Sequence, residues 1–172
     1  MFTERAKLLY GANRDIKMKK NINGDTRSAD HIPTIEEFDM ANISHRDDVR
    51  KLVDRFTKLL LESAEEHDWS KVKEPFKSMF YRDMVDTMEK RLSFEDGEWY
   101  KLHTQKLEHH HLNEYVPDDV DLFDVIEMIC DCVCAGMTRQ GEVRPVEIKN
   151  EVLQKAIENT VEILKNQIEV VD

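Results

Sequence analysis

Apolar residues recur at intervals of three and four along most of this chain, the spacing that places side chains on one face of an α-helix. One such series, within residues 49–60, predicts a helix over 45–66 that Ser44 would cap. A shorter helix is expected over residues 33–40. Runs that alternate β-branched and polar residues are absent from the sequence, so the pattern predicts an all-α fold.

The second half of the chain continues the helical pattern. A stripe of apolar residues spaced by four follows Pro75 and is expected to face the core. Its members are Phe76, Phe80, Met84 and Met88. Residues 98–111 form a polar segment that is expected to be helical. A longer helix should begin at the acidic turn 117–119, run through Cys134 and stop at Gly136.

The last expected helix follows a loop over residues 141–145 and carries its own apolar stripe. The members of this stripe are Leu153, Ile157, Val161, Leu164 and Ile168. Such a stripe suits either the core of the chain or the seam of a homo-oligomer. We favour the core, and the oligomeric state stays open.

Three cysteines lie within five residues, at Cys130, Cys132 and Cys134. Their odd number and close spacing favour reduced thiols over a disulfide framework. Cys130 and Cys134 share one helical face and are expected to pack in the core, whereas Cys132 points elsewhere.

Length and composition are those of one compact domain, because the chain has 172 residues of which 40% are hydrophobic. We divide it into an arm with a short helix, residues 1–42, and a helical domain, residues 43–172. The first 28 residues hold seven basic and three acidic side chains. This basic arm is expected to be a solvated tail or lid, with contact to RNA or phosphate as the weaker alternative.

The net charge of −11 argues against a protein whose main partner is nucleic acid, since such proteins need a basic face. Small anionic substrates remain possible where metal ions supply positive charge. The sequence has neither an apolar run of the roughly 20 residues that cross a bilayer nor an apolar N-terminal signal. We therefore expect a cytoplasmic protein without membrane contact.

Six of the seven histidines, together with two aspartates, make the most informative chemical pattern in the chain. They are His45, His67, His103, His109, His110 and His111, with Asp68 and Asp131. Imidazole and carboxylate groups bind divalent transition metals, so the series predicts a metal centre. Three consecutive histidines cannot all face one way, so we exclude His111 and leave open which of His109 and His110 is a ligand.

The string His67-Asp68-Trp69-Ser70-Lys71 resembles the H-D-x-G-K signature of the HD-domain metal-dependent phosphohydrolase superfamily. Ser70 stands where glycine is usual. His45, followed four residues later by Val49, resembles the H-x-x-x-V helix that opens this family.

The later motifs extend the resemblance over residues 44–135. His103 and the His109-His110 pair are similar to the extra histidines of two-metal members, including HD-GYP phosphodiesterases. Asp131, within Glu-Met-Ile-Cys-Asp, stands where the family has its final aspartate ligand. The greatest likeness is to uncharacterised bacterial and phage proteins that share H-D-x-S-K, H-H and E-M-x-x-D.

The resemblance implies an HD-like helical bundle that holds one or two divalent ions of manganese, iron, zinc, nickel, cobalt or magnesium. Its ligands would be His45, His67, Asp68, His103, His109, His110 and Asp131. A metal-activated water would hydrolyse a phosphate ester or anhydride, with a small nucleotide as the expected substrate, and Lys71 would neutralise charge on the phosphate. Glu66 and Glu74 could support the ligands or transfer protons, although both are more typical of solvated surface acids.

One geometric condition accompanies this ligand set. His45 and His67 are 22 residues apart and would lie about 33 Å apart along one straight helix, so a shared metal requires a reversal of the chain, expected within residues 57–64. Two alternatives stay open: a di-iron oxygenase of HD type, and a non-catalytic protein that binds a nucleotide or another protein.

Overall fold

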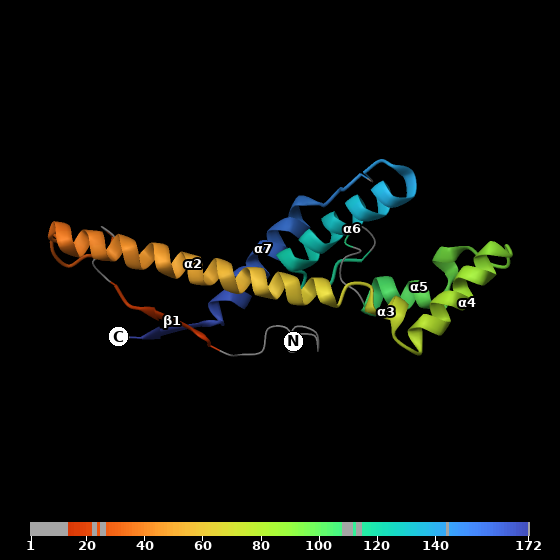
Figure 1. The fold of residues 1–172 in the computed structure, drawn as a ribbon, viewed down its shortest axis with the longest axis horizontal. Helices are drawn as coiled ribbons and strands as arrows, with labels where there is room; N and C mark the ends of the chain where they lie inside the picture. The colour runs from red at the N-terminus through yellow and green to blue at the C-terminus, as the bar shows by residue number, and fades with distance from the viewer. Residues whose placement is uncertain are drawn as a thin grey trace. The chain divides into compact units, whose positions relative to one another are not determined.

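The computed structural model describes residues 14–21, 24, 27–107, 112, 115–143 and 145–171, except for the side chains of residues 106 and 107. Most of these residues are helical, as predicted (Figure 1). Two short strands, β1 (Ile16–Lys19) and β2 (Ile168–Val171), were not predicted. Four residues are too few to show an alternating pattern, and the two strands come from opposite ends of the sequence.

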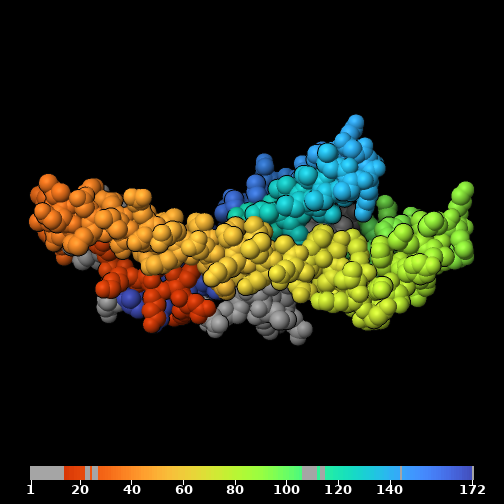
Figure 2. All heavy atoms as spheres, viewed as in Figure 1, coloured from red at the N-terminus to blue at the C-terminus, as the bar shows by residue number. Residues whose placement is uncertain are grey.

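Helix α2 runs without interruption over Ile35–Glu65. It begins at a capping box, in which the Thr34 amide donates to the Glu37 carboxylate (2.8 Å) and the Glu37 amide donates to the Thr34 hydroxyl (3.2 Å). Two expectations are therefore wrong: the separate short helix before Ser44, and the reversal within residues 57–64. Helical hydrogen bonds continue through both places because neither glycine nor proline interrupts them. Figure 2 shows all heavy atoms in the same view, with α2 running from orange to yellow.

The described residues fall into two compact units. The first unit contains the residues through Leu61 and those from Val161 onward, and the second contains Glu62–Thr160. Residues 42 and 43, between which the sequence prediction divides the chain, both lie inside α2. Within the first unit β1 and β2 pair in parallel, with Ile16 opposite Ile168. The Arg55 guanidinium donates two hydrogen bonds to the buried side chain of Gln167 (3.1 and 3.0 Å), which ties α2 to the residue before β2.

The second unit is built from short and long helices in alternation with turns. Its elements are α3 (Trp69–Val72), α4 (Phe76–Met88), the 3-10 turn η2 (Phe94–Asp96), α5 (Glu98–Leu102), the π-helical η3 (His103–Leu107), α6 (Leu122–Gln140) and most of α7 (Asn150–Lys165). An apolar cluster that joins α6 to α7 includes Val125, Met128, Val152 and Ala156. None of the described helices is both long and apolar enough to cross a bilayer.

Helix α6 begins and ends later than the sequence predicts. Asp121 caps its first turn by accepting hydrogen bonds from the amides of Phe123 and Asp124, so the cap lies beyond residues 117–119. The helix passes through Gly136 and ends at Gly141, whose φ of 75° lies in the left-handed region that favours glycine. A glycine within a helix thus does not by itself end it, because glycine only weakens helix propensity, whereas the left-handed backbone at Gly141 ends the helix.

The buried face of α7 is one residue out of register with the predicted stripe. The buried residues are Val152, Ala156, Thr160 and Ile163. Leu153, Ile157 and Val161 of the predicted stripe are 38%, 40% and 55% exposed, so the expectation that they form the core is wrong. Both rows of residues have helical spacing, and a shift of one residue rotates the selected face by 100°.

The stripe on α4 and the cysteines of α6 show similar differences. Met84 and Met88, expected in the core, are exposed, while the one buried residue of α4 is Asp83. Cys132 packs against the apolar cluster, whereas Cys130 and Cys134 are exposed, which reverses the predicted arrangement.

Candidate metal centre

The H-D motif lies in a tight turn between α2 and α3. Asp68 has φ 55° and ψ 23°, which places its backbone in the left-handed region at the N-terminus of α3. Aspartate tolerates this conformation better than most residues, but it still carries strain, which other contacts must offset. Strained positions of this kind gather at functional sites, and here the turn brings His67 and Asp68 together.

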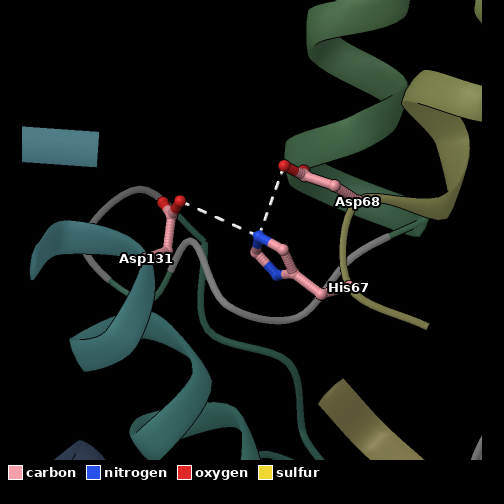
Figure 3. A group of neighbouring side chains, drawn as sticks. All are labelled: His67, Asp68 and Asp131. Carbon is pink, nitrogen blue, oxygen red and sulfur yellow. Dashed lines mark ion pairs between the residues drawn. The ribbon is translucent and has the colours of Figure 1, made fainter. Parts of the chain in front are cut away.

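His67 and Asp68 meet Asp131, which lies on α6 and 64 residues further along the chain than His67. One donor atom from each residue lies within 4.8 Å of the others, and all three residues are half-buried. His67 Nε2 is 3.3 Å from Asp68 Oδ2 and 3.8 Å from Asp131 Oδ1 (Figure 3). Among the described residues, this is the group whose geometry suits a metal ion.

Glu127 contacts the other nitrogen of the same imidazole ring. Its Oε1 lies 2.8 Å from His67 Nδ1, and its Oε2 accepts a 3.0 Å hydrogen bond from the Ser63 hydroxyl. Both Glu127 and Ser63 are buried. Glu127 is the first residue of the E-M-x-x-D motif, which by itself does not predict this contact. The available signal was its spacing of four residues from Asp131, which places both carboxylates on one helical face.

His103 lies on the other side of Asp68. Its side chain is 2% exposed, its Nε2 is 3.5 Å from Asp68 Oδ1, and its Nδ1 is 2.9 Å from the Ser70 hydroxyl. The ring stacks on Trp99 with centroids 4.3 Å apart and planes inclined by 19°. Ser70, which departs from the glycine of the HD signature, therefore holds a histidine that the sequence predicted to be a ligand.

Trp99 is held in place by other residues of the second unit. The buried Asp83 carboxylate accepts a hydrogen bond from the Trp99 amide (2.7 Å), at the start of α5. Gly97 is required beside it, because a Cβ at this position would collide with that carboxylate. The backbone of the following η3 is π-helical from His103, a distortion that occurs frequently at functional sites.

The charges of the group are mutually compensated. Lys71 Nζ forms an ion pair with Asp68 Oδ2. Burial acts to raise the pKa of Asp68, but hydrogen bonds from His67 and Lys71 outweigh burial and hold this pKa well below its usual range. Hydrogen bonds to Asp68 and Glu127 raise the pKa of His67 to about 10 despite partial burial. Without a cation, the carboxylates are thus balanced by a protonated imidazole and a lysine.

The remaining predicted site residues either lie apart from this group or fall outside the described residues. His45 is exposed on α2 in the first unit, and the uninterrupted helix lacks the reversal that would make it a ligand beside His67. His45 is therefore not among the grouped donors of the described residues. His109 and His110 lie outside the described residues. Glu66 pairs with Lys73 and Glu74 accepts from Ser78, both at exposed positions, which is the arrangement of surface acids.

Comparison with known proteins gives a family but no function. Residues 34–170 match a family of unknown function, DUF5662, and the chain belongs to this family. The match includes α2, the H-D turn, α6 and α7. Neither a curated protein nor a solved structure matches the chain.

Proposed function

We propose that this member of the DUF5662 family is a metal-dependent phosphohydrolase of HD type that acts on a small nucleotide or a related phosphate compound. The observation that carries the proposal is the convergence of His67, Asp68 and Asp131, whose donor atoms lie within 4.8 Å of one another. One imidazole and two carboxylates form a donor set that suits manganese, iron, zinc or magnesium.

The charge of the group supports a divalent cation. Three carboxylates, those of Asp68, Glu127 and Asp131, surround one imidazole ring. A cation bound by His67 Nε2 and the two aspartates would polarise a phosphoryl oxygen and lower the pKa of a bound water toward neutrality. It would replace the proton of His67 as the positive charge among the acids.

Lys71 is suited to contact the substrate. Its amine pairs with Asp68, lies 5.9 Å from the centroid of the Trp99 ring, and belongs to a side chain that is 30% exposed. An ammonium group in this place can stabilise the negative charge that develops on a phosphoryl group. His103, beside the second oxygen of Asp68, is the candidate ligand for a second ion. A net charge of −11 favours a small phosphate compound over a nucleic acid.

The test compares metal content in protein purified without chelators or a metal-affinity tag. The native chain should hold one or two equivalents of a divalent metal, and His67→Ala with Asp68→Ala should remove it. The chain offers a matched control in Asp30 and His31, an exposed pair of the same two residue types that are also hydrogen-bonded to each other (2.6 Å). Asp30→Ala with His31→Ala should leave the metal in place.

Activity is then measured by phosphate release from a panel of nucleotides in the presence of each metal. Release that requires both the metal and the His67-Asp68 pair supports the proposal. Failure to bind any added metal would overturn it and leave a binding protein. Bound iron with oxygen consumption and without phosphate release would identify the oxygenase instead.

A further inference from the structure

Glu127 is a buried carboxylate with a partner on each oxygen. Its Oε1 lies 2.8 Å from His67 Nδ1 and its Oε2 lies 3.0 Å from the Ser63 hydroxyl. Burial of a charged carboxylate is costly unless hydrogen bonds compensate for the lost water. The two contacts account for that compensation, and they direct the carboxylate at a single ring nitrogen.

This contact selects which nitrogen of His67 is available to a ligand. An imidazole can bind a metal through Nδ1 or Nε2, and a carboxylate hydrogen-bonded to one nitrogen keeps the proton there and leaves the other nitrogen as the ligand atom. Glu127 occupies the Nδ1 side. Asp68 Oδ2 and Asp131 Oδ1 face Nε2, at 3.3 and 3.8 Å.

We propose that Glu127 is a positioning residue that directs His67 Nε2 toward the metal-binding group. The proposal rests on the metal centre put forward above. Glu127 is not itself one of the grouped donors, which among the described residues are those of His67, Asp68 and Asp131. Its role is to fix the orientation and protonation of the ring, and the Ser63 hydroxyl fixes Glu127 in turn.

The register of α6 supplies both contacts at once. Glu127 and Asp131 are one helical turn apart, and they approach opposite nitrogens of the same ring. The E-M-x-x-D spacing therefore places one carboxylate to position the His67 ring and the other to bind the metal. A metal ligand whose second nitrogen is held by a carboxylate is also a stronger electron donor.

The experiment measures zinc affinity by competition with a chelator and records long-range ¹⁵N–¹H NMR spectra of the zinc-loaded full chain. In the native protein, His67 should bind zinc through Nε2 and carry a proton on Nδ1. Glu127→Ala should lower the affinity by about 10 to 100-fold, the usual effect of removing an outer hydrogen-bond partner, and should abolish the preference for Nε2.

Glu127→Gln separates positioning from charge. The glutamine oxygen can still accept a hydrogen bond from Nδ1, so this variant should keep the Nε2 preference while its affinity lies between those of the native and alanine proteins. Glu158→Ala, which removes an exposed acid from α7 in the same unit, should leave both the affinity and the spectrum unchanged.

Several outcomes would overturn the proposal. Zinc bound to native His67 through Nδ1 would do so without any variant, which keeps the test decisive even where Glu127→Ala does not fold. A folded Glu127→Ala protein with native affinity through Nε2 would overturn the positioning role and leave the metal centre intact. A native chain that binds no metal would overturn this proposal together with the proposed function.

Discussion

Helices α2 and α6 each carry a residue that the sequence predicts as a metal ligand, but only α6 brings its residue into the group. Asp131 lies one turn from Glu127, on a helix whose buried residues include Asp124 and Glu127 as well as apolar side chains. His45 is exposed on α2, where Val49 and Val53 are also 47% and 56% exposed. The difference teaches that residue type alone does not place a predicted ligand in the group, since the face of the helix that carries it must also be at least partly buried.

The largest expected effect concerns the free energy of unfolding. It tests whether α6 contributes a buried core while α2 is exposed around His45. Met128 is 5% exposed in the apolar cluster. Met128→Ala should lower the free energy of unfolding by about 2 to 5 kcal/mol, because the smaller side chain leaves a cavity. Val49→Ala on α2 should change this free energy by less than about 0.5 kcal/mol. Denaturant unfolding measures both, and equal losses would contradict the burial difference.

The next effect concerns metal binding. Asp131→Ala should lower metal affinity by more than about 100-fold, beyond the usual effect of an outer hydrogen-bond partner, since it removes a ligand. His45→Ala should leave the affinity unchanged. Chelator competition measures both variants. A matching loss in His45→Ala would restore His45 as a ligand and contradict its placement here.

Metal affinity should depend on pH, because His67 must lose a proton before it can bind a metal. The pKa of His67, raised to about 10 in the cation-free protein, means that the ring is protonated at neutral pH and must lose that proton to bind a metal. Affinity should therefore rise about tenfold per pH unit between pH 6 and 8. Calorimetric titration in buffers of different ionisation enthalpy should show one proton released per ion. Binding that does not vary with pH would refute this displacement.

The smallest expected effect concerns the N-terminal caps of α6 and α2. Asp121→Ala removes two hydrogen bonds at the buried start of α6 and should cost about 1 to 2 kcal/mol in the free energy of unfolding, at the upper end for such caps. Thr34→Ala at the exposed start of α2 should cost about 0.5 kcal/mol. Thermal and denaturant unfolding measure the two values. A larger loss at Thr34 would reverse the comparison.

The three described members of the candidate group could be predicted from the sequence, but the contacts that organise the group could not. His67, Asp68 and Asp131 could be predicted because ligand chemistry belongs to residue types and motif spacing. Glu127 and Ser63 could not, since a polar side chain on a helix is indistinguishable from a solvated one until its burial is known. The predicted reversal of the chain after His45 was wrong, because a motif gives the order of residues along the chain but not the path of the backbone that connects them.

The sequence by itself determined the helical class, the start of α4 after Pro75 and the chemical types assembled at the turn after α2, because periodicity and side-chain chemistry are local properties. Only the tertiary structure decided which face of α7 is buried, where α6 stops, and that one imidazole lies between Glu127 and Asp131. These features depend on which surfaces meet. Two rows of residues on one helix can have the same spacing, and only the neighbouring helix selects between them.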